Sequence, residues 1–480
     1  MADPDVKHDD YTEYQDVWQK CRDAYGGQRT IRKGRSLYLP ELIGQTKTDY
    51  DKYLARANFF NATGRTVEAM NGLVFRKDMT VEIPESIKTW LDDITLADET
   101  LTDFAETSLT EVMTTGRGGI FVDMPRAADN ITKAQAEAQQ IRPYLVFYKT
   151  ESIINWEMAR VNNAYRLVNV WLSEYYKAED GKQEVQIRQL RLTGGVYFQD
   201  IWQKGDGTNW AVKETIVPTS NGANITEIPF YPLSSRKPTM DVVAPPIEAL
   251  VDVNIAHYQN SADLENGAHI AGQPTPYVTG FEEGYDANGN AVGSTLNIGS
   301  STILTFANKD TTVGFLQCGS EGFATLEKLM DRKEGQMASL GANLLAPEKK
   351  GVEAARTHEI KSGNESGSLA STCGVVERQI EKALKFAAKW QGVTGEISVE
   401  LNRDFFPPNF TGADLSAWVA ARQAGEISKE TLFNVLKYTE WLPEERTFEE
   451  EQDAIEQDGP TLGELTLEAK TPSANDNKDE

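Results

Sequence analysis

Two long stretches of helical periodicity, separated by residues 273–320, constrain the fold of this 480-residue chain more than any other feature. The first follows the pair Pro245-Pro246, which is typical of a helix start, and runs to Gly272. At 1.5 Å per residue this stretch is about 40 Å long. The second, over 321–343, repeats a heptad pattern that only a lysine interrupts: Phe323, Leu326, Met330, Lys333, Met337, Leu340 and Leu344. The pattern predicts a long helical hairpin.

The first of these helices carries two separate stripes. One stripe is apolar and contains Val251, Ile255, Tyr258 and Ala262. The other is polar and acidic, and no Lys or Arg occurs from 244 to 271. A charged stripe of this kind can line a channel, form an exposed outer face or contact a neighbouring chain. The candidate channel-lining residues are Glu248, Asp252, Gln259 and Asp263.

A third helical stretch is predicted over 354–391, where apolar residues keep the same spacing: Leu369, Cys373, Val376, Ile380, Ala383, Ala387 and Trp390. Between it and the second helix lies a short loop, 344–353, with two adjacent lysines. The candidate residues in and next to this loop are Glu348, Lys349, Lys350, Glu353 and Arg356. The loop lacks the glycine spacing of a phosphate-binding loop. An ordinary solvated surface loop is the alternative interpretation.

The rest of the chain alternates between helical and β-rich regions. The N-terminal part predicts helices in "DDYTEYQDVWQKCRDAYGG", from Thr48 to Val74, in "ESIKTWLDDI" and in "TLTDFAETSLTEVMTT". Residues 143–232 predict a series of strands separated by turns, and 273–320 predict short strands and glycine turns. From Glu444 to Glu480 there are 13 acidic and 3 basic residues, so we expect an acidic, disordered tail over 458–480.

Composition excludes several classes of protein. The formal net charge of -25 disfavours a protein that wraps nucleic acid with a broad basic face. The three cysteines are widely separated, so neither a disulfide framework nor a zinc site is expected. No apolar run is long enough to span a membrane. The chain has no phosphate-binding loop and no histidines at metal-ligand spacing. We therefore expect no enzyme activity, no metal and no cofactor.

The order of several segments resembles a known family. These segments include "YLPEL", "YDKYLARANFFNATGRTVEAMNGLVFRK", "TTGRGGIFVDMP", "ESIINWEM", "EIPFYPL", "PPIEALVDVNIAHYQNSADLENGAHIAGQPTPYVTG", "LNIGSSTILTF", "LMDRKEGQMASLGANLL" and "GEISKETLFNVLKYTEWLP". Together they are similar to the portal proteins of tailed bacteriophages, in the branch that carries the domain of unknown function DUF4055. The resemblance covers roughly Tyr11 to Glu456, although no single motif is diagnostic.

The resemblance implies an α+β subunit that assembles into a ring, commonly of twelve copies. Its wing would be 1–243, β-rich over 143–232, with a return strand in 392–410. The stem helices would be 244–272 and 321–343, the small α/β clip 273–320 and the tunnel loop 344–353. A long helix, 354–391, would lie beneath a helical crown, 411–457. The clip docking tip would contain Phe281, Glu282, Glu283, Tyr285 and Asp286.

The resemblance also implies a function and a set of partners. Such a ring forms a non-enzymatic channel for double-stranded DNA at one vertex of the capsid, used in packaging and ejection. Its partners would be further copies of the chain, the large subunit of the terminase, tail adaptor proteins, and capsid and scaffolding proteins, with no membrane. The protein would be found in the virion, and in the host cytoplasm during assembly. The alternative function is a structural head–tail adaptor or scaffold component that conducts no DNA, and a helical hairpin within a monomer core stays possible.

Overall fold

The structure is a computed structural model that describes residues 3–125, 139–161, 163–178, 181–205, 209–272, 275–280, 284–285, 291–292, 310, 312–316, 321–342, 355–403, 405, 411–443 and 445–457. The chain forms two compact units, Met1–Arg403 and Asp404–Glu480. Helices and antiparallel strands occur in separate segments, which confirms the α+β class. Among the described residues, no helix combines the length and apolar character of a membrane span.

The N-terminal part of the first unit is helical. Its elements are α1 Asp9–Tyr25, α2 Gln28–Gly34, η1 Arg35–Leu37, α3 Lys47–Arg56, α4 Ala62–Val74, η2 Glu85–Asp92 and α5 Leu101–Thr115. The single helix predicted from Thr48 to Val74 is wrong in detail. Thr46 caps α3 and Asn61 caps α4, each accepting a hydrogen bond from a backbone N–H three residues later. The predicted helix at 85–92 is a 3₁₀ helix.

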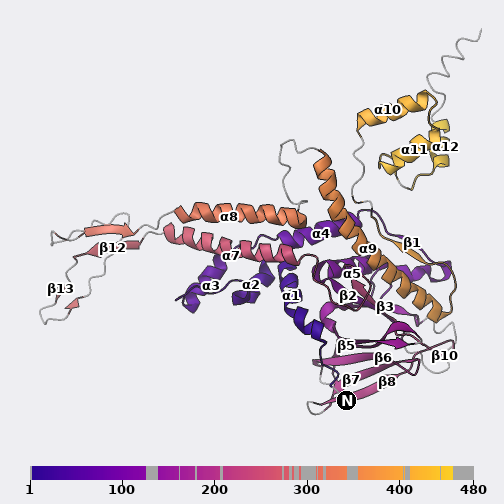
Figure 1. Ribbon diagram of the computed structural model, residues 1–480, viewed down its shortest axis with the longest axis horizontal. Helices are drawn as coiled ribbons and strands as arrows, with labels where there is room; N and C mark the ends of the chain where they lie inside the picture. The colour runs from indigo at the N-terminus through magenta and orange to yellow at the C-terminus, as the bar shows by residue number, and fades with distance from the viewer. Residues whose placement is uncertain are drawn as a thin grey trace, which may run out of the picture. The chain divides into compact units, whose positions relative to one another are not determined.

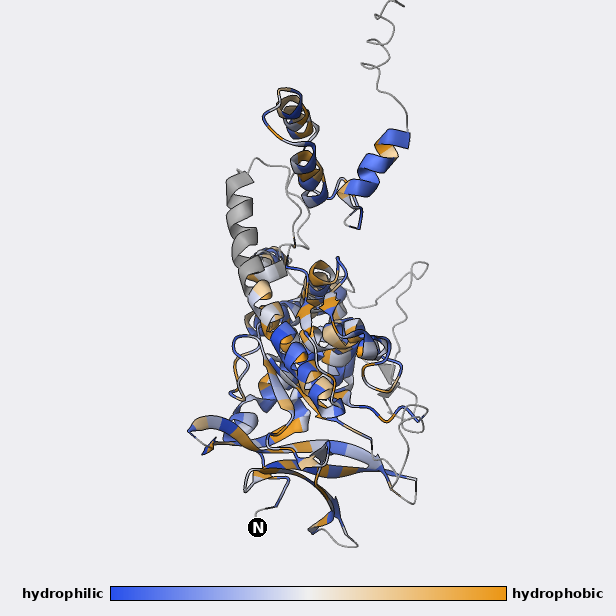
Figure 2. Cartoon of the chain, turned by 90° about the vertical axis from the view of Figure 1, so that its right-hand side faces the viewer, coloured by the Kyte–Doolittle hydropathy of each residue, from blue (hydrophilic) through white to orange (hydrophobic). Residues whose placement is uncertain are grey.

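The strands form small antiparallel sheets. A five-stranded sheet has the order β4-β5-β6-β7-β8, a three-stranded sheet has the order β11-β2-β3, and β1 pairs with β16 and β9 with β10. Hydrophobic and hydrophilic residues are mixed along these strands (Figure 2). The bounds are β1 Thr80–Glu82, β2 Arg117–Asp123, β3 Tyr144–Lys149, β4 Ile153–Val161, β5 Ala164–Lys177, β6 Gln183–Thr193, β7 Val196–Lys204, β8 Trp210–Ile216, β9 Thr219–Ser220, β10 Ala223–Asn224, β11 Phe230–Ser234 and β16 Ser398–Glu400. The β-rich region predicted over 143–232 is confirmed, with a short 3₁₀ helix, η3 Thr150–Ser152, between β3 and β4.

The predicted helical hairpin is present. Helices α7 Glu248–Ala271 and α8 Glu321–Met337 lie side by side, and α1, α2 and α3 lie along α7 (Figure 1). Between the two helices in sequence are the antiparallel pairs β12 Thr275–Thr279 with β15 Thr312–Leu316, and β13 Gly284–Tyr285 with β14 Ala291–Val292. A π-helical turn, Ala338–Ala342, follows α8.

The third predicted helix, α9 Ala355–Gln391, packs on β11 and β2 of the three-stranded sheet. The apolar residues that predicted it, from Leu369 to Trp390, are all buried. Their spacing of three and four residues places them on one face of the helix, and this face covers the sheet. From Thr372 onward α9 is buried on most of its sides, so the apolar spacing marked part of its buried surface.

The second unit contains three short helices, α10 Gly412–Gln423, α11 Lys429–Tyr438 and α12 Phe448–Gln457. Thr411 and Asp414 form a capping box at the start of α10. Phe433 of α11 is buried and its ring packs edge-on against Phe448 of α12. Helix α12 is largely hydrophilic and has no buried residue (Figure 2).

Candidate functional site

The contact between α7 and α8 is narrow and follows the predicted heptad seam. Phe323, Leu326, Met330 and Lys333 are half-buried and Met337 is buried. Lys333, the residue that interrupts the apolar pattern, donates a hydrogen bond from Nζ to the backbone oxygen of Ala256 on α7, at 2.7 Å. The ammonium group of Lys333 therefore has a hydrogen-bond acceptor on the neighbouring helix, and the two helices stay packed at this position. The seam prediction is correct as far as Met337, whereas Leu340 is exposed.

The polar stripe of α7 contacts the N-terminal helices of the same chain. Lys20 on α1 forms an ion pair with Asp252 at 2.6 Å and lies 3.9 Å from Glu248. Gln259 donates a hydrogen bond to the backbone oxygen of Tyr38 at 2.9 Å. These contacts join residues that are more than two hundred positions apart in the sequence.

Asp263, the fourth member of the stripe, accepts a hydrogen bond of 2.6 Å from the hydroxyl group of Tyr53 on α3. Burial raises the pKa of Tyr53, and the contact with Asp263 raises it further, so the phenol stays a donor. All four predicted residues thus have partners within the chain. Lys20, Tyr38 and Tyr53 gave no signal in the sequence that would connect them with α7, and a role of the stripe in lining a channel stays a prediction.

One titratable side chain is buried between the two helices. His257 of α7 is 3% exposed, and its Nε2 lies 3.3 Å from Oε1 of Glu334 on α8. Its Nδ1 has no hydrogen-bond partner among the described residues, and its ring packs near Phe60. Burial lowers the pKa of His257, and the positive charge of Lys333 lowers it further, while Glu334 acts in the opposite direction. The neutral imidazole is therefore favoured at neutral pH.

The C-terminal end of α8 is anchored to the body of the first unit and then changes conformation. Met337 packs in a cluster with Ala62 of α4 and Leu250 of α7. In the following π-helical turn, Gly341 has a φ angle of 118°, which side-chain-bearing residues rarely adopt. The helical backbone therefore ends at this glycine, next to Met70 and Thr66 of α4.

The predicted loop and tip residues lie mostly outside the described part of the chain. This holds for Glu348, Lys349, Lys350 and Glu353 of the loop and for Phe281, Glu282, Glu283 and Asp286 of the tip. Arg356 lies in α9 and Tyr285 in β13, at positions where side chains are outside the description. The roles assigned to these residues stay predictions.

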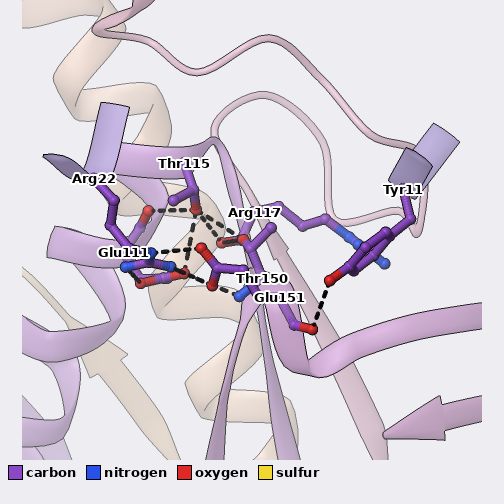
Figure 3. Close-up of polar contacts among 7 residues, drawn as sticks. All are labelled: Tyr11, Arg22, Glu111, Thr115, Arg117, Thr150 and Glu151. Atoms are coloured by element: carbon purple, nitrogen blue, oxygen red, sulfur yellow. Dashed lines mark hydrogen bonds and ion pairs between the residues drawn. The ribbon is translucent and has the colours of Figure 1, made fainter. Parts of the chain in front are cut away.

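A buried ionic network that sequence reasoning missed joins α1 to α5 and η3 (Figure 3). Arg22 donates to both carboxylate oxygens of Glu111, at 3.0 and 2.6 Å, and to both of Glu151, at 2.5 and 2.7 Å. Glu111 also accepts from the backbone N–H of Thr150 at 3.0 Å, and Thr115 donates to it at 3.3 Å. Burial alone would lower the pKa of Arg22, but the two carboxylates raise it overall, so the cation persists.

Arg117 lies beside this network (Figure 3), and among the described residues it forms no ion pair with a carboxylate. Its guanidinium group stacks 4.0 Å above the ring of Trp156 and donates to the backbone oxygen of Ile153 at 3.3 Å. Burial lowers its pKa to about 9. The charge of Asp10 acts in the opposite direction, and the tryptophan face and the carbonyl also stabilise the charged form. Across the residues for which side chains are described, no group of three or more His, Cys, Asp or Glu is arranged to hold a metal.

Comparisons with known proteins give one family match and several structural similarities. A family model described as "Domain of unknown function (DUF4055)" matches residues 246–391, which include α7, α8 and α9. A comparison with curated proteins gives no match.

The similar solved structures include the neck of an empty gene transfer agent (GTA) particle computed with C6 symmetry, at 13% identity and a TM-score of 0.39, covering 82% of this chain and 94% of that one. They also include the virion of the native GTA particle, at 12% identity and a TM-score of 0.39, covering 86% and 99%. The neck of the native GTA particle computed with C12 symmetry has 12% identity and a TM-score of 0.36, covering 78% and 89%. These TM-scores are too low for a further conclusion.

Proposed function

We propose that this chain is the subunit of a portal-type ring, a non-enzymatic channel through which double-stranded DNA passes into and out of a capsid. The ring would dock the terminase during packaging and tail adaptor proteins afterwards. The observation that carries this proposal is the exposure of α8. Every α8 residue from Gly322 to Gln336 outside the seam is exposed, so within the described part of the chain only the side facing α7 is covered.

We infer that copies of the same chain, arranged in a closed ring, cover the other sides of this helix. The seam buries too little apolar surface to hold the hairpin rigid on its own, since Met337 is the one fully buried apolar side chain among its described residues from Phe323 onward. Neighbouring hairpins would cover the exposed sides of α8. The order of segments that resembles the portal family supports the same assignment: two long helices, a β tip between them, a short stretch with two adjacent lysines and a third long helix.

The net charge of the chain fits a channel through which DNA passes better than a protein that binds DNA tightly. A formal net charge of -25 repels phosphate groups, so duplex DNA would slide along the channel without settling into a tight, salt-sensitive complex. Lys349 and Lys350 in the loop before α9 would give each subunit a brief contact with the passing duplex. The absence of a phosphate-binding loop from the sequence supports a passive role, and we expect the purified protein to hydrolyse no ATP.

Electron microscopy of the purified full-length protein tests the proposal. We expect rings with an axial hole wide enough for a DNA duplex, which is about 20 Å across. Rings without an axial hole would favour the adaptor alternative. A protein that stays monomeric at every concentration and salt condition would overturn the proposal.

The loop is tested separately by Lys349→Ala combined with Lys350→Ala. We expect this double variant to form normal rings but to package or retain less DNA than the wild type, because the positive charges on the loop are lost. A matched variant, Arg236→Ala with Lys237→Ala, removes two adjacent exposed charges outside α7 and α8 and serves as the control. Packaging that is unchanged in the loop variant would remove the loop from the mechanism.

A further inference from the structure

A groove in the first unit lies away from the α7–α8 hairpin. It is formed between the β4–β5–β6 part of the five-stranded sheet, β11, the segment that follows β11, and α9. Its volume is about 570 Å³, within the range of about 300–1,000 Å³ that is usual for ligand sites. None of the residues that line it belongs to the helical hairpin.

The floor of the groove is apolar and contains two methionines. It is lined by Met158, Leu167, Leu192, Ile228, Phe230 and Met240. Methionine side chains are unbranched and polarisable, so they adapt to apolar groups of different shapes. The floor therefore suits an aromatic or aliphatic side chain without selecting one particular shape.

The rim of the groove is polar and exposed. It contains Tyr165, which is 69% exposed, together with Arg166, Lys382 and Glu227. The two cations outnumber the single anion, although the chain as a whole carries a net charge of -25. This local excess of positive charge complements a carboxylate in the occupant.

A buried hydrogen-bond acceptor also lines the groove. Gln379 of α9 is 2% exposed, and its Nε2 donates to the backbone oxygen of Pro232 at 2.8 Å. Its Oε1 is buried and has no partner among the described residues. A buried acceptor without a donor is costly, by about 1–3 kcal/mol. A peptide N–H group would satisfy it once the side chain turns toward the groove, since the oxygen itself is buried from solvent.

We propose that this groove binds an extended segment of a partner protein in which an apolar side chain lies next to a carboxylate. The apolar side chain occupies the floor, the carboxylate pairs with Lys382, and a backbone N–H group of the segment donates to Gln379. A peptide fits better than a small apolar molecule because the rim is open, whereas small ligands are mostly enclosed by their sites. A surface groove with apolar pockets and charged rim residues is a common mode of peptide recognition.

The test uses a displayed library of random peptides, on the order of twelve residues long, with the full-length protein as bait. Pools are counter-selected on a Lys382→Glu variant. We expect the enriched peptides to carry an aromatic or aliphatic residue beside Asp or Glu. In fluorescence anisotropy, synthetic copies should bind the wild type, and their Kd should rise about tenfold or more for Lys382→Glu and for Tyr165→Glu.

The control is Lys389→Glu, which makes the same change of charge on α9, about two turns further along and outside the groove. Both Lys382 and Tyr165 are exposed, so their substitution leaves the fold intact. Affinity that falls equally in the Lys389→Glu variant, or an enrichment of basic peptides, would contradict the assignment. A library without any groove-dependent peptide would overturn it, as would a groove that binds only dodecanoate or only a second copy of the chain.

Discussion

Replacing Glu111 with alanine removes the centre of the buried network that joins α1 to α5. The side chain of Glu111 is 5% exposed and accepts two hydrogen bonds from Arg22 and one from the backbone of Thr150. Breaking a buried ion pair by removing one partner costs about 3–5 kcal/mol. Arg22 keeps its bonds to Glu151 and is 27% exposed, so we expect the lower end of this range, a loss of about 3 kcal/mol.

Urea unfolding followed by tryptophan fluorescence measures this loss, because most of the nine tryptophans lie in the first unit. The isosteric variant Glu111→Gln keeps one oxygen for Thr150 but loses the charge and one of the two acceptors for Arg22, so its loss should be smaller, about 1–2 kcal/mol. Glu151→Ala is the matched control, since Glu151 is 36% exposed and its removal should cost about 1 kcal/mol or less. Equal losses for Glu111→Ala and Glu151→Ala would refute the reasoning, because burial would then make no difference.

Three further predictions concern the α7–α8 hairpin, the three-stranded sheet and the contact of α3 with α7. Burial lowers the pKa of His257, so its neutral side chain contributes to stability above the ordinary histidine pKa of about 6.5, and this contribution is lost as the pH falls below that value. The wild type should therefore be less stable at about pH 5 than at about pH 7.5, and His257→Gln should reduce this difference in unfolding free energy. Gly119→Ala should destabilise the first unit by about 1–3 kcal/mol in urea, since a Cβ would lie 2.2 Å from the ring of Phe230; a neutral effect would contradict this packing. Tyr53→Phe should lower the midpoint of thermal unfolding by removing the hydrogen bond to Asp263, worth about 0.5–1.5 kcal/mol, and an unchanged midpoint would argue that the contact is absent.

The sequence predicted the two helices of the α7–α8 hairpin well because each depends on local periodicity. The span 244–272 was predicted from a proline pair and a terminal glycine, and the helix occupies Glu248–Ala271. The heptad spacing of 321–343 identified the residues of α8 that face α7, including Lys333. These patterns are properties of one segment at a time, which is why they can be recognised without the fold.

Contacts between distant segments could not be predicted in this way. The stripe of Asp252 and Asp263 was correctly recognised as a separate face of α7, but its partners Lys20 and Tyr53 lie on other helices, more than two hundred residues away. A charged face has the same pattern whether it faces solvent, a neighbouring chain or the protein's own helices. The network around Glu111 was missed for the same reason, because an acidic residue on a helix gives no sign that it is buried.

The contacts between α7 and the N-terminal helices decide which parts of this chain can be studied separately. A fragment restricted to residues 246–391, the span that the family model matches, would contain α7 and α8 but none of α1, α3 or α4. Asp252, Gln259 and Asp263 would lose Lys20, Tyr38 and Tyr53, and Met337 would lose Ala62. Such a fragment would expose the apolar side of α7 to water and aggregate. A dissection of the hairpin therefore has to retain the first 75 residues, because they complete its surface.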